Sequence, residues 1–253
     1  MAPQRVPEGP PPAPAVQKLR IRYAKRGRLR FSSTRDFSRA IERALRRAGV
    51  PMAFSAGFHP HPKISYANGA PTGAASEAEY FEISVVERVD PESVRAALDE
   101  ALPDGLDVVE VVEAGPGGLA DRLEASRWRV EFPGVTAAEA EAGIRAFLDA
   151  PSAQVTRTFK TGPKTFDVRP PVLSAAVDPV DGSEASGMPC AILTMVVRHT
   201  TPATRPDDVL TALRAIGFAP PTPARVTRLA QGPLTATAGV ADPLAADKNT
   251  VAP

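Results

Sequence analysis

Cysteine is almost absent from this sequence: the 253 residues include only Cys190. One cysteine excludes an internal disulfide framework, a four-cysteine zinc site and a three-cysteine iron–sulfur motif. Because Cys190 lies in a short apolar run that ends at Leu193, we expect it to be buried in the core.

Long apolar runs are absent as well. No stretch approaches the length that crosses a bilayer, and the proline-rich residues 1–16 lack the apolar segment of a secretory signal. The sequence therefore predicts a cytoplasmic protein with no membrane partner.

The signatures of the common enzyme classes are missing too. The chain has no phosphate-binding loop, no dinucleotide-binding glycine motif, no nucleophile-elbow serine and no paired-histidine zinc motif on a helix. We therefore predict a binding protein rather than an enzyme, and we assign no catalytic residue, no metal ligand and no cofactor.

What the sequence does have is a strong local excess of positive charge. Residues 18–47 contain twelve Lys or Arg against two acids, Asp36 and Glu42, whereas the net charge of the whole chain is only +1. The remainder is therefore acidic by about nine charges. This asymmetry favours a binding face for an anionic partner, with a phosphate backbone as the first candidate.

The apolar pattern of the first half predicts the order strand, helix, strand, strand, helix, strand. Ser33 or Thr34 is expected to cap the first helix and Gly49 to end it. The expected elements are a strand at 19–23, a helix containing Phe37 to Ala48, an extended segment at 51–67, a strand at 80–86, a helix at 91–102 and a strand at 106–112.

The second half repeats this order less clearly. Thr136 is expected to cap its first helix. The expected elements are a strand at 127–132, a helix to Leu148, an extended hairpin at 155–177 with its turn at 161–164, a strand at 191–197, a helix at 206–216 and a last strand at 225–229.

Both halves therefore match the ferredoxin-like split pattern, and we predict an α+β fold of two tandem ferredoxin-like (βαββαβ) halves. The glycine-rich residues 115–118 separate them. The expected divisions are a disordered tail at 1–16, a first half with the basic site at 17–114, a second half at 119–233 and a disordered tail at 234–253.

The first helix carries the sharpest candidate site. Its arginines recur at spacings of four, four and three, which places them on one face opposite the apolar residues. Basic residues of the preceding strand, such as Lys18, Arg20 and Arg22, are expected to add to the same field. The plain alternative is a solvated helix face whose arginines pair with acids such as Glu77 and Glu79. The candidate anion-binding residues here are Arg35, Arg39, Arg43, Arg46 and Arg47.

A second candidate group is the Gly57–Lys63 segment. Its alternating prolines impose extended backbone, so His59 and His61 are expected to face the same way with Lys63 alongside. The two imidazoles fit three roles: contact with phosphates or bases, general acid–base chemistry, or metal binding. Metal binding is disfavoured because no neighbouring residue supplies a third ligand.

The predicted hairpin of the second half is also basic. It carries Lys160, Lys164 and Arg169, and such a hairpin can follow a phosphate backbone. Basic hairpins also occur simply for solubility, and both interpretations stay open.

Four segments together resemble a known family. Residues 31–36, 40–49, 54–65 and 76–80 resemble the radical-SAM-linked family, a bacterial domain of unknown function that occurs alone or fused behind a B12-binding radical SAM protein. The match is dense over residues 19–86. The family often has Ser-His-Leu-Asp where this chain has Ser33 to Asp36, so any role of that histidine is missing here.

The resemblance implies an accessory of radical SAM chemistry that acts on RNA. The chain lacks the cluster cysteines of a radical SAM enzyme, so it is expected to be a partner of one. Our leading hypothesis is a binding protein that holds RNA or a phosphorylated substrate on the basic face. The alternatives are a metal-independent RNA-processing endonuclease, by fold analogy, and an adaptor that docks an acidic protein.

Overall fold

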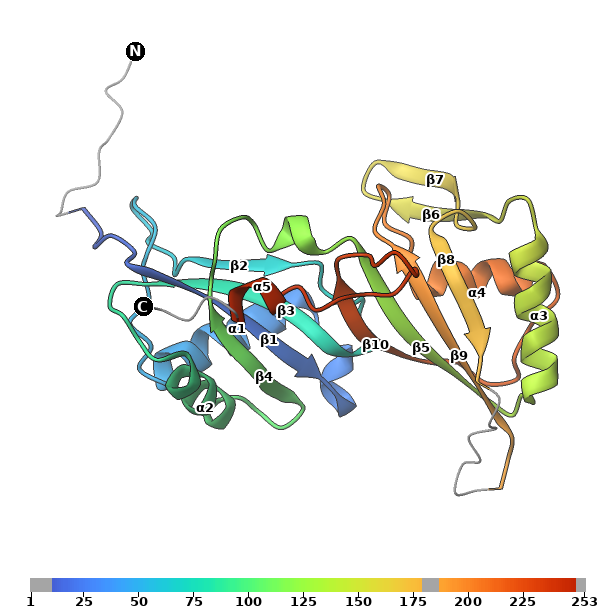
Figure 1. Cartoon of the computed structure of the whole chain (residues 1–253), viewed down its shortest axis with the longest axis horizontal. Coiled ribbons are helices and arrows are strands. Elements are labelled where there is room, and N and C mark those ends of the chain that lie inside the picture. Colours follow the sequence, from blue (N-terminus) through green and yellow to red (C-terminus); the bar gives the residue numbers. More distant parts are fainter. Residues whose placement is uncertain (1–10, 179–186, 249–253) are drawn as a thin grey trace, which may run out of the picture. The chain divides into compact units, whose positions relative to one another are not determined.

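The computed structural model describes residues 11–178 and 187–248, in which five α-helices and ten strands form a mixed α+β structure (Figure 1). Nearly all of the strand pairings given are antiparallel; the exception joins β10 to β3. The chain divides into two compact units that are not consecutive stretches. Unit 1 is residues 1–72, 78–120 and 244–253, and unit 2 is residues 73–77 and 121–243.

Unit 1 has the predicted order of elements, with the strands side by side as β4-β1-β3-β2. Each predicted strand and helix of this half is present, and the long extended segment contributes only a short strand, β2. The elements are β1 Gln17–Lys25, η1 Gly27–Phe31, α1 Thr34–Arg47, β2 Ile64–Ala67, β3 Ala75–Val85, α2 Pro91–Ala101, β4 Leu106–Glu113 and α5 Ala245–Lys248; η2 Ala120–Arg122 follows where the chain passes from unit 1 to unit 2.

The core of unit 1 follows from the alternation of β1. Leu19, Ile21 and Tyr23 point to one side, where the apolar faces of α1 and α2 cover them. Helix α1 contributes Phe37, Ile41, Ala44 and Leu45 to this cluster, and Tyr23 stacks on Phe37 at 4.6 Å between ring centroids. Burying this face fixes α1 on the sheet, so its opposite face is turned to solvent.

The C-terminal tail is a correction to the sequence prediction. Residues 234–248 are ordered: Leu234 pairs with Val240, Leu244 is fully buried, and α5 packs Asp247 into unit 1. The physical reason is a buried arginine of β1 that requires a carboxylate, as described below. The predicted tails at 1–10 and 249–253 lie outside the described residues.

Unit 2 orders its main strands as β10-β5-β9-β8, and the first residues of β3 pair in parallel with β10. The predicted hairpin at 155–177 is shorter than expected: β6 and β7 form a separate two-stranded sheet joined at residues 160–161, and residues 172–177 form β8, which pairs with β9 instead. Cys190 is buried as expected. The elements are β5 Ala125–Pro133, α3 Ala137–Asp149, β6 Gln154–Phe159, β7 Gly162–Asp167, β8 Val172–Val177, β9 Cys190–Arg198, α4 Pro206–Ala215 and β10 Arg225–Gly232.

Candidate nucleic-acid interface

Helix α1 begins at a side-chain cap and exposes a row of arginines. The Ser33 hydroxyl oxygen accepts a hydrogen bond from the Asp36 amide at 3.2 Å, as expected for an N-cap serine. The buried positions of the helix are Phe37, Ile41, Ala44 and Leu45. The five candidate arginines are all exposed: Arg35, Arg39, Arg43, Arg46 and Arg47.

These arginines, which we call the arginine face, have no ion-pair partner within residues 11–178 and 187–248. Across the described residues, no carboxylate lies within 4.0 Å of any of the five guanidinium groups. Like charges at spacings of three and four residues repel by a few tenths of a kcal/mol per pair. An anion that binds here would relieve that repulsion.

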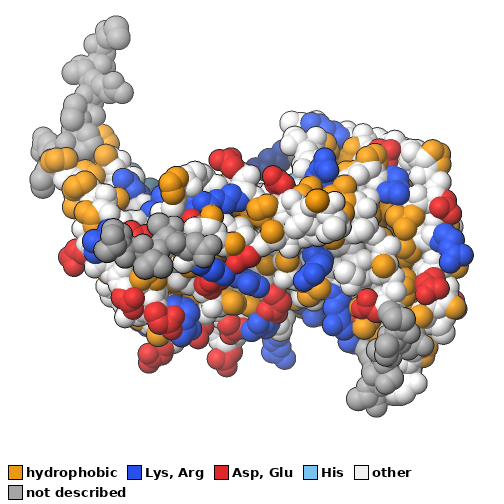
Figure 2. Space-filling view, viewed as in Figure 1, with side chains coloured by type: hydrophobic (Ala, Val, Ile, Leu, Met, Phe, Trp, Pro, Cys, Tyr) orange, Lys and Arg blue, Asp and Glu red, His pale blue; other side chains and the backbone are white. Residues whose placement is uncertain are grey.

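Charge is separated between the two helices that cover unit 1. Helix α1 carries five arginines against two acids, whereas α2 carries Glu92, Asp99 and Glu100 against Arg95. Figure 2 shows acidic side chains gathered over α2. The positive field of unit 1 is therefore a property of α1 and not of the unit as a whole.

An exposed loop of residues 54–62 leads towards β2, and we call it the 54–62 loop. It carries His59 and His61, and Lys63 directly follows it. The loop is closed at its base, where Phe54 pairs with Pro62 and the Ser55 amide donates to the His61 carbonyl at 2.9 Å. Both imidazoles are exposed, and neither ring has a hydrogen-bond partner in the described part of the chain. Nothing therefore orients either ring for proton transfer.

Tyr66 on β2 connects this strand to the arginine face. Its ring meets Phe37 edge-on at 5.6 Å, and its hydroxyl interacts with Ser38. Burial raises the pKa of Tyr66, the bond to Ser38 opposes that shift, and the nearby charge of Glu42 adds to it. Tyr66 therefore lies beside the part of α1 that carries Phe37, Ser38 and Glu42.

The residues that sequence reasoning missed are aromatic. Four aromatic side chains of the described residues count as exposed, and all come from residues 31–66 of unit 1. The sequence did contain a signal for these residues. They lie outside the apolar positions of the predicted helices, in segments rich in Gly and Pro. Their exposed fractions are 59% for Phe31, 43% for Phe54, 60% for Phe58 and 37% for Tyr66.

The basic residues of β1 do not all join the arginine face, which corrects the sequence expectation. Arg20 is fully buried: its Nη1 donates to both oxygens of Asp247 at 2.8 Å, and its Nε donates to Glu82 at 2.9 Å. Burial lowers the pKa of Arg20, but the hydrogen bonds that it donates to Asp247 and Glu82, together with their negative charges, outweigh burial and raise the pKa. Lys18 lies 3.8 Å from Glu82.

The acids at the start of β3 occupy other places than expected. The expectation was that Glu77 and Glu79 would pair with the arginines of α1, which the structure does not show. Glu79 is buried and accepts a hydrogen bond from the Ala70 amide at 2.9 Å. The arginine face is therefore left without these carboxylates.

The basic hairpin belongs to unit 2, and its basic side chains differ in their exposure and contacts. Lys160 and Lys164 are exposed, with Lys164 Nζ 5.7 Å from the Phe159 ring centroid. Arg169 instead donates to the backbone carbonyls of Leu148 and Val172, both at 3.0 Å. These contacts hold Arg169 in a structural position, so we omit it from the candidate surface.

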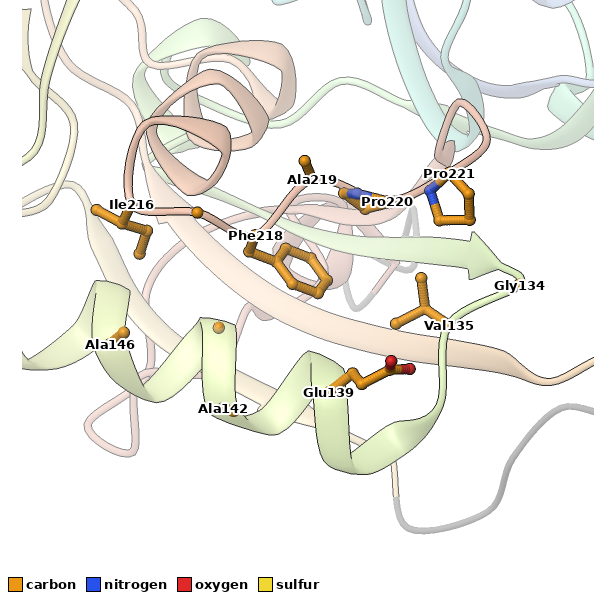
Figure 3. A pocket seen from close by; sticks show the side chains of 12 residues that line it. Gly134, Val135, Glu139, Ala142, Ala146, Ile216, Phe218, Ala219, Pro220 and Pro221 are labelled. Carbon is orange, nitrogen blue, oxygen red and sulfur yellow. The ribbon is translucent and has the colours of Figure 1, made fainter.

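Two further features of unit 2 resemble sites but supply no chemistry. A cavity of about 600 Å³ lies between α3 and the chain after α4 (Figure 3). Glu139 is the only charged group among its described lining residues, and it caps α3 with Thr136. Ser126 bonds His199 at 2.8 Å, but Ser126 is almost fully buried and cannot meet a substrate.

Searches for other kinds of site gave no candidate. Over the described residues, no group of three or more His, Cys, Asp or Glu side chains is arranged to hold a metal ion. Within the same residues, no helix has both the length and the apolar character to cross a membrane.

Two solved structures are weakly similar to this chain. An encapsulated DyP-type peroxidase of Mycobacterium smegmatis is 10% identical, with 87% of this chain and 92% of that chain covered at a TM-score of 0.21. DyPB from Rhodococcus jostii RHA1 is 12% identical, with the same coverage and TM-score. Similarity at this level carries no argument about fold or function. No curated protein matches.

One family model does match, over residues 18–206, which include the arginine face, the 54–62 loop and most of unit 2. The match covers well over half of the sequence. The chain therefore belongs to the bacterial family DUF2344, described as an uncharacterized protein conserved in bacteria.

Proposed function

We propose that this chain is an RNA-binding accessory protein that holds the phosphate backbone on the arginine face of α1. The observation that carries the proposal is the set of five exposed arginines that no carboxylate of the described residues neutralises. A guanidinium group presents paired N–H donors that match phosphate oxygens, which favours phosphate as the anion.

The surroundings of α1 support a polyanion rather than a single anion. The helix has 14 residues and is therefore about 20 Å long, which is long enough to contact several phosphates in succession. Lys63 lies three positions before Tyr66, about 10 Å away along an extended chain, and adds a further exposed cation to unit 1.

The link to radical SAM chemistry is part of the proposal and rests on the resemblance of residues 19–86. On this view the chain presents RNA to a separate radical enzyme, because its single cysteine cannot hold an iron–sulfur cluster. We do not extend the proposal to RNA cleavage, since neither loop histidine has an orienting partner among the described residues.

We also infer that each unit is a ferredoxin-like repeat. The strand orders β4-β1-β3-β2 and β10-β5-β9-β8 correspond to each other position by position, if the β6–β7 hairpin is taken as an insertion between α3 and β8. Each first strand also pairs antiparallel with the last strand of its unit. Two corresponding orders support repetition of one βαββαβ unit.

The proposal is tested by titrating a labelled 12-nucleotide single-stranded RNA with the protein at several salt concentrations. We expect the logarithm of the association constant to fall linearly with the logarithm of the salt concentration, by about 0.7 for each phosphate contact. The double variant Arg39→Ala/Arg43→Ala should bind more weakly, with a slope that is shallower by about 1.4.

The matched control is Arg145→Ala/Arg214→Ala, which removes two exposed helical arginines from unit 2. It has the same change in net charge and should retain the wild-type slope. Absence of binding by the wild-type protein at low salt would reject the proposal, and so would an equal loss of slope in both double variants.

A further inference from the structure

We propose that the exposed aromatic side chains of unit 1 stack on unpaired bases, so that the ligand of the arginine face is single-stranded nucleic acid. This inference rests on the proposed function and specifies its substrate class. It concerns Phe31, Phe54, Phe58 and Tyr66.

The first step is the location of these rings. Exposed apolar residues scattered singly are ordinary on a protein surface, and unit 2 has such a residue in Ile216. The exposed aromatic rings of the described residues are not scattered in this way. All of them come from one stretch of 36 residues, which also contains the arginine face. A concentration of large exposed apolar groups in one segment indicates a contact surface.

The second step is the position of the rings along α1. Phe31 ends η1, three residues before the helix begins, and Tyr66 packs against its second turn through Phe37. Phe54 and Phe58 belong to the loop reached by the chain soon after the helix ends, with Phe54 at the base of the loop. Aromatic groups therefore occur before, beside and after the arginine face in the chain.

The third step is the pairing of rings with cations. The Arg30 guanidinium carbon lies 4.7 Å from the centroid of the Phe31 ring, and Phe31 is nevertheless 59% exposed. Lys63 follows the loop that carries Phe54 and Phe58, and it is exposed. Cations interleaved with exposed rings are what proteins use to hold single strands, since phosphates bind the cations and bases stack on the rings.

The fourth step excludes the other polyanions. A duplex keeps its bases stacked on one another and offers no free base faces, so the exposed rings would have no partner. An acidic protein could pair with the arginines and bury the phenylalanines. It would, however, gain no more from aromatic rings than from other apolar side chains. Single-stranded RNA and single-stranded DNA share the required chemistry, and the experiment separates them.

The test compares five labelled or competing probes on the full chain: oligouridine of 12 nucleotides, the thymidine oligomer of the same length, a 12-base-pair RNA duplex, inorganic polyphosphate and polyglutamate. We expect both single strands to bind more tightly than the duplex. Tighter binding of oligouridine than of the thymidine oligomer would identify RNA as the preferred ligand. Equal affinities would mean that the site binds single-stranded RNA and single-stranded DNA alike.

The decisive variant is Phe54→Ala/Phe58→Ala. Base stacking on an aromatic side chain typically contributes a factor of about 5 to 150 per base, so we expect oligouridine affinity to fall at least about tenfold. Polyphosphate has no bases, so its affinity for the variant should equal that for the wild type. The control Val109→Ala/Ile216→Ala removes two exposed apolar side chains elsewhere and should leave both affinities unchanged.

The outcomes separate this inference from the proposed function. If wild type binds polyphosphate and oligouridine equally well and Phe54→Ala/Phe58→Ala changes neither, the stacking proposal is wrong while phosphate binding stands. Preference for polyglutamate over oligouridine would overturn it in favour of an acidic protein partner. If neither phosphate-containing probe binds at low salt, the proposed function itself fails. Circular dichroism of each variant shows whether it is folded.

Discussion

At the scale of single residues, alternation along β1 predicts which side chains share a face, but it does not reveal that both faces are covered. The apolar face of Leu19, Ile21 and Tyr23 lies in the core, as an alternating strand pattern indicates. Arg20 was expected in the exposed basic field, and it is buried because Asp247 reaches it from 227 residues away. A partner that distant leaves no local pattern, so no window of sequence could reveal it.

His199 is a second residue whose environment the sequence did not reveal. Its Nδ1 lies 2.7 Å from the Leu123 carbonyl, which can only accept, so Nδ1 carries the proton and Nε2 accepts from the Ser126 hydroxyl at 2.8 Å. Burial lowers the pKa of His199 from its ordinary 6.5; the bond to Leu123 opposes this, and the positive charge of Arg228 adds to it.

A pH dependence of stability follows from that shift. The unfolded chain takes up the proton of His199 at a higher pH than the folded chain does, so the free energy of unfolding should fall as pH is lowered through 6.5 towards 5. Urea denaturation at pH 7.5, 6.5 and 5.5 measures it. We expect His199→Asn to flatten this part of the profile.

The control for this prediction is His61→Asn, which replaces an exposed imidazole and should retain the wild-type profile. An unchanged pH profile in His199→Asn would show that another group sets the dependence.

At the scale of elements, the sequence predicted positions well because local signals are strong. The cap at Ser33 and the apolar spacing of α1 located the arginine face correctly, and Thr136 caps α3 as expected. The 51–67 segment was harder: its prolines and Gly57 indicated an extended chain, but only pairing with β3 selects Ile64–Ala67 as a strand. Exposure of the rings in its loop depends on the same tertiary pairing.

Helix α3 offers a test in which two effects on stability oppose each other. Replacing a glycine inside a helix by alanine normally stabilises it by about 1 kcal/mol. At Gly143, however, a Cβ would lie 2.7 Å from the Phe218 ring, which itself packs edge-on against Phe132 at 5.2 Å. Overpacking typically costs about 1–3 kcal/mol, so Gly143→Ala should lower the free energy of unfolding in urea by roughly 1 kcal/mol.

The same alanine becomes stabilising once the ring is removed. In a Phe218→Ala background, Gly143→Ala should raise the free energy of unfolding relative to Phe218→Ala alone, because only the helical preference then remains. If Gly143→Ala changes the free energy of unfolding equally in both backgrounds, the Phe218 ring does not restrict the space at position 143.

At the scale of the whole molecule, the sequence could not reveal that unit 1 is completed by the end of the chain. Residues 244–253 follow all of unit 2, yet they belong to unit 1. Leu244 is fully buried, Asp247 also accepts from the Gly115 amide at 2.9 Å, and Lys248 bonds Glu110 at 2.7 Å. The composition of this region is typical of a disordered tail, and contacts with residues far away in the sequence, among them the buried guanidinium of Arg20, give it a fixed place.

Deleting residues 244–253 should therefore destabilise unit 1 selectively. Removing one partner of a buried ion pair costs about 3–5 kcal/mol, and the loss of a buried leucine adds to that, against about 5–15 kcal/mol for a whole domain. Hydrogen exchange followed by mass spectrometry should show faster exchange in peptides from β1 and β4 and unchanged exchange in those from β5 and β9.

Deletion of residues 249–253 alone is the matched control and should leave β1 protected. Equal protection of β1 in both truncated chains would contradict the role given to Leu244 and Asp247, and faster exchange in all four strands would show that the two units unfold together.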